Sequence, residues 1–236
     1  MKKGFIGLMV QVCIVCSGLT LVQGGQPSQG EPQGPPVPTV GTASPMDRDL
    51  NGLMEEWAHI KYEVPDKNEQ EQQMGALMSK ASTVTKIYHE RAEPYIWEAI
   101  ITSTQAGIVG GLGALGYAKD AKKILEQAEA INPRALDGAI YTSLGALYYQ
   151  VPGWPIGFGD DEKARAYLER ARTMSPDDID SNYFYGEFLI DQGEYAKAIA
   201  VLEHALAAPD RPNRPIADAG RRAEIRQSIA MAKKKL

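Results

Sequence analysis

The sequence has few of the residues that build disulfide scaffolds and metal sites. It contains only two cysteines, Cys13 and Cys16, and its three histidines, His59, His89 and His204, lie far apart without the spacing of paired metal ligands. An excess of positive charge is also lacking: 25 Lys and Arg residues stand against 30 Asp and Glu residues, and the formal net charge of −5 argues against nucleic-acid binding. The chain has no Gly-x-Ser-x-Gly turn and no nucleotide-binding loop. We therefore expect no metal, no cofactor and no enzymatic activity.

The first 45 residues are not expected to belong to the folded domain. Lys2 and Lys3 precede an uncharged stretch, residues 4–22, and this pattern is typical of a signal peptide, which we place at residues 1–24. Export to the periplasm or secretion follows, with no stable membrane insertion after cleavage. The alternative is an uncleaved N-terminal membrane anchor, because the stretch is just long enough to span a bilayer. Residues 25–45 are rich in proline and glycine and predict a disordered linker.

Three segments of the remaining chain share the pattern Ala-x-x-apolar-Leu-Glu-x-Ala. They are residues 121–128, 164–171 and 198–205, and a proline follows each within five residues. Their apolar positions lie three and four residues apart and so form one face of a helix. Alanine at the ends of this face lets a neighbouring helix approach closely, and the proline ends the helix. We call these segments the Ala-Leu cassettes. Their recurring glutamates, Glu126, Glu169 and Glu203, are expected to face solvent or to pair between repeats.

A second helix with an internal glycine, Gly145 or Gly186, precedes each of the last two cassettes. Glycine weakens a helix, so it predicts a point where two helices cross without a side chain between them. The last two cassettes are 34 residues apart, and this arrangement resembles the tetratricopeptide repeat. In the first copy, the glycines beside Val109 stand near the expected position. The resemblance implies an all-α, helix-turn-helix solenoid with capping helices. Its parts are a divergent N-terminal helix pair (46–94), three repeats (95–133, 135–176 and 177–210) and a C-terminal capping helix (216–236).

Ten residues between the two helices of the second repeat, Gln150–Gly159, combine apolar side chains with prolines and glycines. Trp154, Ile156 and Phe158 would be costly to expose to water. Two interpretations stay open: a rigid plug over neighbouring helices, or a flap that lines a pocket or meets a partner. A helical repeat interrupted by such a loop resembles the T component of tripartite ATP-independent periplasmic transporters. That resemblance implies a small apolar ligand handled beside a solute-binding protein.

Stacked helical repeats present a concave groove lined by the first helix of each unit. Taking Gly145 and Gly186 as equivalent places acidic, tyrosine and small apolar side chains there, which favours an apolar or basic ligand over a carboxylate. A merely solvated face is the alternative. The basic run from Arg221 to Lys235 is interpreted as a capping helix with a frayed end, or as a contact with an anionic membrane. The candidate groove and flap residues are Thr142, Ala146, Tyr149, Trp154, Phe158, Asp180, Tyr183, Glu187 and Ile190.

The sequence therefore predicts an exported, non-catalytic scaffold that binds an envelope protein or a peptide. The alternative is a subunit resembling the T component that binds a small apolar ligand for a transporter.

Overall fold

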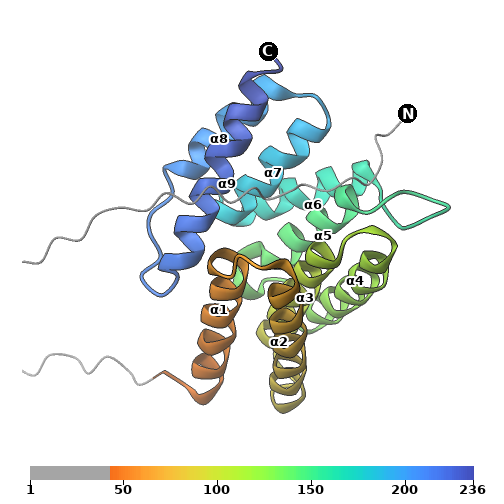
Figure 1. The fold of residues 1–236 in the computed structure, drawn as a ribbon, viewed down its shortest axis with the longest axis vertical. Coiled ribbons are helices and arrows are strands. Elements are labelled where there is room, and N and C mark those ends of the chain that lie inside the picture. The colour runs from red at the N-terminus through yellow and green to blue at the C-terminus, as the bar shows by residue number, and fades with distance from the viewer. Residues whose placement is uncertain (1–42) are drawn as a thin grey trace, which may run out of the picture.

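A computed structural model describes residues 43–236, so the predicted signal peptide and nearly all of the predicted linker lie outside the described residues. Within this range the ordered elements are helices, which confirms the all-α prediction (Figure 1). The helices are α1 (Pro45–Glu63), α2 (Lys67–Ile87), α3 (Ala92–Val109), α4 (Ala114–Ile131), α5 (Ala139–Gln150), α6 (Asp161–Met174), α7 (Ile179–Asp191), α8 (Tyr195–Leu206) and α9 (Pro215–Lys233). None of them is long and apolar enough to cross a bilayer.

Short polar side chains fix where several helices begin. Ser44 and Asp47 form a reciprocal capping box at the start of α1. Asp66 caps α2, Asp160 caps α6 and Asp178 caps α7, each by accepting hydrogen bonds from backbone N–H groups of the first turn. These caps set the lengths of the loops between helices and therefore the register in which successive helices pack.

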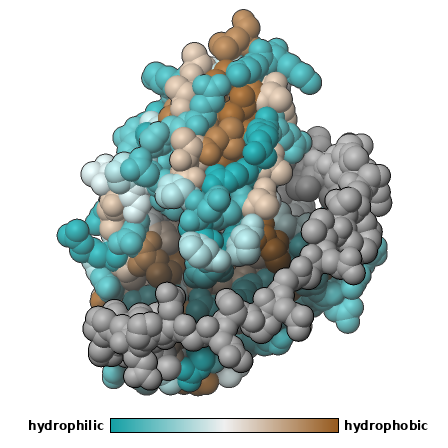
Figure 2. Space-filling view, turned by 90° about the vertical axis from the view of Figure 1, so that its left-hand side faces the viewer, coloured by the Kyte–Doolittle hydropathy of each residue, from teal (hydrophilic) through white to brown (hydrophobic). Residues whose placement is uncertain are grey.

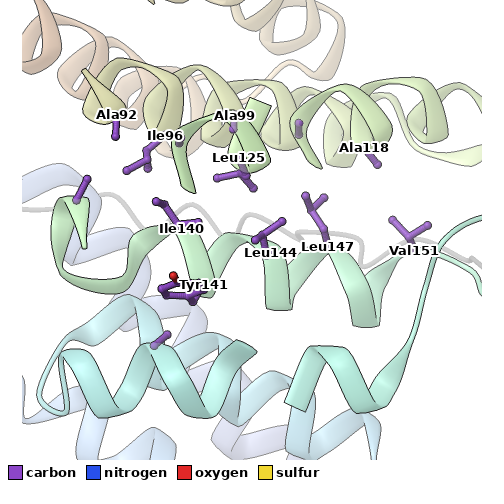
Figure 3. Packing of buried hydrophobic residues seen from close by; sticks show 14 residues of the cluster. Ala92, Ile96, Ala99, Ala118, Leu125, Ile140, Tyr141, Leu144, Leu147 and Val151 are labelled. Carbon is purple, nitrogen blue, oxygen red and sulfur yellow. The ribbon is translucent and has the colours of Figure 1, made fainter. Parts of the chain in front are cut away.

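The Ala-Leu cassettes lie on the second helix of three successive hairpins, α3–α4, α5–α6 and α7–α8, as predicted. Leu125, Leu168 and Leu202 are fully buried, and so are the alanines that flank each of them. Figure 3 shows Leu125 of α4 in the same layer as Ile96 and Ala99 of α3 and Leu144 of α5. The cassette glutamates are exposed: Glu169 accepts a hydrogen bond from the Tyr185 hydroxyl of α7, and Glu203 pairs with Lys233 of α9.

The helical glycines mark the crossing points inside the hairpins. A methyl group on Gly145 would lie 2.6 Å from Leu168 Cγ, and one on Gly186 would lie 2.5 Å from Leu202, so each glycine faces the leucine of its own cassette. The first hairpin differs from expectation. The glycines beside Val109 form the turn between α3 and α4, because Gly110 and Gly111 adopt φ values of 66° and 56° that suit glycine. Ala99, buried on α3 in the cluster that contains Leu125, supplies the small side chain of this hairpin.

The two ends of the solenoid meet. We expected α9 to cap the end opposite α1, but α9 packs against α7 and α8 and also lies beside α1 (Figure 1). The Glu224 carboxylate of α9 accepts a hydrogen bond from the Tyr62 hydroxyl (3.1 Å) and pairs with Lys61 Nζ (3.1 Å). Ala217 of α9 is buried in the same apolar cluster as Leu53 of α1. The first helices of the hairpins therefore surround an interior that α9 closes.

The face formed by the C-terminal helices carries an apolar strip along its upper half, with polar atoms on both sides (Figure 2). Partly buried apolar side chains of the last hairpin include Ile199 and Leu206 of α8. These side chains of the last hairpin are covered less completely than the cassette leucines, which are fully buried.

Candidate functional site

The loop between α5 and α6 is fixed at its base by backbone hydrogen bonds. Asp160 N–H donates to the Tyr148 carbonyl (2.9 Å), and Gly159 N–H donates to the Pro152 carbonyl (2.9 Å). Glycine is required at 159, because a Cβ there would lie 1.8 Å from the Val151 carbonyl oxygen. The loop is therefore a rigid turn that continues directly into the capped start of α6.

The apolar side chains of this loop separate into two groups. Phe158 is partly buried and packs against the core, edge-to-face on Tyr148 with 5.5 Å between ring centroids. Trp154 and Ile156 point outward and are 90% and 58% exposed. The plug interpretation thus describes Phe158, whereas Trp154 is left uncovered and lines neither of the two cavities described below.

A second exposed apolar side chain lies on the same edge of the molecule. Leu112, in the turn between α3 and α4, is 88% exposed. The two connections are neighbours, since a methyl group on Gly157 would come within 3.3 Å of Leu115 Cδ1 at the start of α4 (Figure 1). We call Leu112, Trp154 and Ile156 the apolar edge. Sequence reasoning identified Trp154 and Ile156 but missed Leu112, because a leucine among glycines gives no signal of exposure.

The predicted groove residues of α7 lie beneath α9 and not on an open surface. The Asp180 carboxylate accepts hydrogen bonds from Arg211 and from Arg221, both at 2.8 Å, and Arg214 lies 3.6 Å away. Burial alone raises the pKa of Asp180, but the three guanidinium groups outweigh it and hold that pKa well below its usual range. The Arg221 side chain is only 5% exposed and stacks on the Tyr183 ring at 4.1 Å.

This network explains why the groove prediction differs from the structure. We expected the acidic side chains of α7 to favour a basic ligand. The basic groups come instead from the same chain: Arg211 and Arg214 precede α9, and Arg221 lies within it. Arg221 is therefore buried on the inner side of the capping helix α9 and is not part of a frayed end. Arginines spaced along the C-terminal segment were the available sequence signal, but sequence spacing does not show which carboxylate they reach.

The remaining groove candidates also lie between helices. Glu187 Oε1 is buried without a hydrogen-bond partner among the described residues, and burial raises the pKa of this carboxyl. Burial and the neighbouring Glu187 raise the pKa of Tyr149 as well. Thr142 and Ala146 are buried on α5, where the Thr142 hydroxyl donates to the Gly138 carbonyl (3.3 Å). Ile190 is partly buried against the cluster that contains Tyr183.

Two cavities lie away from all of these residues. One, of about 530 Å³, opens between α1 and the start of α9 and is lined by Met54, Glu55 and Ile216 among others. The other, of about 330 Å³, lies between the α4–α5 connection and the end of α6. Within residues 43–236, no group of three His, Cys, Asp or Glu side chains is placed to hold a metal ion.

Part of the chain is similar to known proteins. Residues 156–215, from the α5–α6 loop to the start of α9, match the family model described as tetratricopeptide repeat. A thermophilic TPR protein from Thermus thermophilus has a similar crystal structure, with a TM-score of 0.55 and 16% identity over 80% of this chain and 99% of that one. At this identity the likeness shows the fold alone.

The tetratricopeptide solenoid is also similar to the crystal structure of the MamA protein, with a TM-score of 0.40 and 17% identity over 77% of this chain and 92% of that one. No curated protein matches the chain. These comparisons confirm the predicted tetratricopeptide-repeat-like fold and give no support to the narrower resemblance to the transporter T component.

Proposed function

We propose that this protein is a non-catalytic scaffold of the cell envelope that holds a partner protein at its apolar edge. The fold is that of a protein–protein interaction module. The observation that carries the proposal is the 90% exposure of Trp154 on a loop whose other aromatic residue, Phe158, is partly buried against the core. A folded chain normally covers a tryptophan when it can, so a fixed and uncovered one favours an intermolecular contact.

The rigidity of the loop strengthens this proposal. Tryptophan is enriched among the residues that dominate binding energy at protein interfaces. A side chain that is already held in place loses less conformational entropy when a partner binds, so more of the contact energy appears as affinity. The Gly153 carbonyl accepts hydrogen bonds from the N–H groups of Ile156 and Gly157, both at 3.2 Å, which holds the tip of the loop as a closed turn.

Site-specific photo-crosslinking tests the apolar edge. A photoreactive amino acid at Gln150, which is exposed at the base of the loop, should give a discrete crosslinked species in the native host. Trp154→Ser and Leu112→Ser should each abolish that species. Leu136→Ser is the matched control, because Leu136 is also exposed (42%) but lies in the α4–α5 connection. A crosslinking pattern that is unchanged by Trp154→Ser would overturn the proposal.

The envelope location is a separate part of the proposal and rests on the N-terminal sequence alone. We expect the mature protein to begin near residue 25 and to fractionate with periplasmic or secreted proteins. Intact-mass measurement of the protein from its host tests this directly. A full-length mass in the membrane fraction would favour the anchored alternative, and a full-length mass in the cytoplasm would refute export.

A further inference from the structure

The smaller cavity differs from the apolar edge because its lining includes basic side chains. Its volume is about 330 Å³, and its lining comprises Pro133, Arg134, Arg170, Thr173 and Met174. Both charged side chains of the lining are arginines, although the chain as a whole carries a net charge of −5. The cavity thus presents a local excess of positive charge on an acidic protein.

The guanidinium donors of these two arginines are largely unused within the described residues. The Arg134 side chain is exposed and makes no hydrogen bond or ion pair with residues 43–236. Arg170 forms a long ion pair with Glu129 of α4, with 3.9 Å between Nη1 and Oε1, and this distance leaves its N–H groups without a hydrogen bond to that carboxylate. The Thr173 hydroxyl, by contrast, already donates to the Glu169 carbonyl at 2.9 Å. The donors that remain available to a ligand at this cavity are therefore those of the two arginines.

Arg170 is held in position before any ligand arrives. Its guanidinium carbon lies over the Tyr141 ring, 3.8 Å from the centroid, and Tyr141 stacks in turn on Tyr167 with 13° between the ring planes. A guanidinium on an aromatic face keeps its edge donors free for a carboxylate. The side chains of Pro133 and Met174 form apolar walls beside it.

The connection that forms one wall of the cavity has an unusual backbone. Leu136 and Asp137 adopt positive φ values of 49° and 46°, which are uncommon for residues other than glycine. The Ser175 hydroxyl donates to the Asp137 carbonyl (2.7 Å) and fixes this connection to the end of α6. Asp137 is the acidic side chain of the connection and does not line the cavity. The arrangement leaves Leu136 42% exposed next to the arginine-lined cavity.

We propose that this cavity is a docking site for an acidic segment of a partner protein. A carboxylate side chain of the segment accepts hydrogen bonds from Arg134 and Arg170, and an adjacent apolar residue packs against Pro133 and Met174. Charge complementarity and the apolar walls identify an acidic, leucine-type peptide as the occupant. The site does not involve the apolar edge, so it stands independently of the proposed function.

The probe for this site is an acetylated peptide that alternates glutamate and leucine, titrated into the full-length protein and followed by NMR. We expect saturable shifts of the Arg170 Nε–Hε signal and the Met174 methyl signal. The same peptide with glutamine in place of glutamate should bind about tenfold more weakly or not at all, because it lacks the charge that the guanidinium groups attract.

Matched variants locate the binding. Arg134→Glu and Arg170→Gln should each weaken binding of the acidic peptide by about tenfold or more. Lys119→Glu makes the same charge change as Arg134→Glu at another exposed basic residue, about 20 Å away along α4, and should leave binding unchanged. Circular dichroism checks that each variant is folded. Trp154→Ser should also bind the peptide normally, which separates this site from the apolar edge.

Three outcomes would overturn the proposal. Equal binding of the glutamine peptide would remove the role of charge. Equal losses from Lys119→Glu and Arg134→Glu would reduce the effect to net charge. Binding to phosphatidylglycerol vesicles that depends on Arg134, without binding of the acidic peptide, would assign the cavity to a membrane surface instead of a protein.

Discussion

The concave side of α7 and the α5–α6 loop were both candidate binding surfaces, but their side chains differ in how far the rest of the chain covers them. On α7, the charged side chain of Asp180 is matched by three arginines of the same chain and covered by α9. On the loop, Phe158 is covered but Trp154 is not. The charge of Asp180 is therefore matched by side chains of the same chain, whereas the apolar surface of Trp154 stays exposed and available to a partner.

This difference shows that an unusual side chain in a repeat protein can have its partner either within the chain or in another molecule. A buried charge is costly unless an opposite charge accompanies it, so its presence on an inner helix predicts a partner, and here the partner is intramolecular. An exposed tryptophan carries no such penalty for the fold and can be retained for binding. Substitutions in each region should therefore have different effects on stability.

The largest effect is expected from Asp180→Ala. The substitution leaves Arg211, Arg214 and Arg221 close together without their shared carboxylate, and breaking a buried ion network of this kind costs about 3–5 kcal/mol in the free energy of unfolding. Urea denaturation measures the loss, and Asp120→Ala, at an exposed position on α4, is the control. A loss below about 1 kcal/mol would show that the network contributes specificity and little stability.

The same carboxylate makes a prediction about pH. Because its pKa is depressed in the folded protein, the stability it provides is complete above the ordinary carboxyl pKa of about 4 and is lost as the pH falls toward the folded value. The Asp180→Ala variant should therefore lose less stability than the parent between about pH 5 and pH 2. Parallel acid unfolding curves for the two proteins would contradict this.

The next largest effect is expected from a change in the packing between the two helices of the last hairpin, α7 and α8. Gly186→Ala would place a methyl group 2.5 Å from Leu202, and we expect about 1–3 kcal/mol of destabilisation from overpacking. Gly52→Ala on α1 is the matched control with the opposite sign. Nothing lies within 4 Å of its added methyl group, so the higher helix propensity of alanine should stabilise the protein by about 0.5–1 kcal/mol. Equal effects of the two changes would contradict the crossing at Gly186.

These hairpins could be predicted from sequence because their determinants are local. The cassette alanines and leucines, the facing glycines and the capping Asp160 act within one or two neighbouring helices, so spacing alone locates them. Closure of the ends could not be predicted in the same way. The contact of Glu224 with Lys61 and Tyr62 depends on rotations accumulated over all the hairpins, and no short pattern encodes that sum.

The candidate site was predictable to a similar extent. The composition of the α5–α6 loop singled out Trp154 and Phe158, but it could not say which ring turns inward. That choice depends on Tyr148 and on the distance between helix ends, which the structure supplies. For α7 the sequence predicted that acidic side chains such as Asp180 favour an apolar or basic ligand, and only the three-dimensional path of the C-terminal segment shows that Arg221 of the same chain pairs with Asp180.

A smaller effect is expected at Glu187, whose Oε1 atom is buried without a hydrogen-bond partner among the described residues. Burial raises the pKa of this carboxyl, so the folded protein loses stability as the pH rises from the ordinary carboxyl pKa to the folded value. Glu187→Gln should therefore be more stable than the parent by about 1 kcal/mol at pH 7. The difference should shrink as the pH falls to about 4, where the parent carboxyl is protonated in both states. A Glu187→Gln variant that is less stable at pH 7 would indicate an ionic partner for this carboxylate.

The smallest effect on stability is expected at Trp154, and it contrasts with the effect expected at Phe158 in the same loop. Trp154→Ala removes a side chain that is 90% exposed, and the free energy of unfolding should change by less than about 0.5 kcal/mol. Phe158→Ala, four residues away, removes packing against Tyr148 and should cost about 2 kcal/mol. Thermal unfolding of the two variants side by side measures both values. If Trp154→Ala were the more destabilising change, the tryptophan would be a structural residue and the apolar edge would lose its main support as a binding surface.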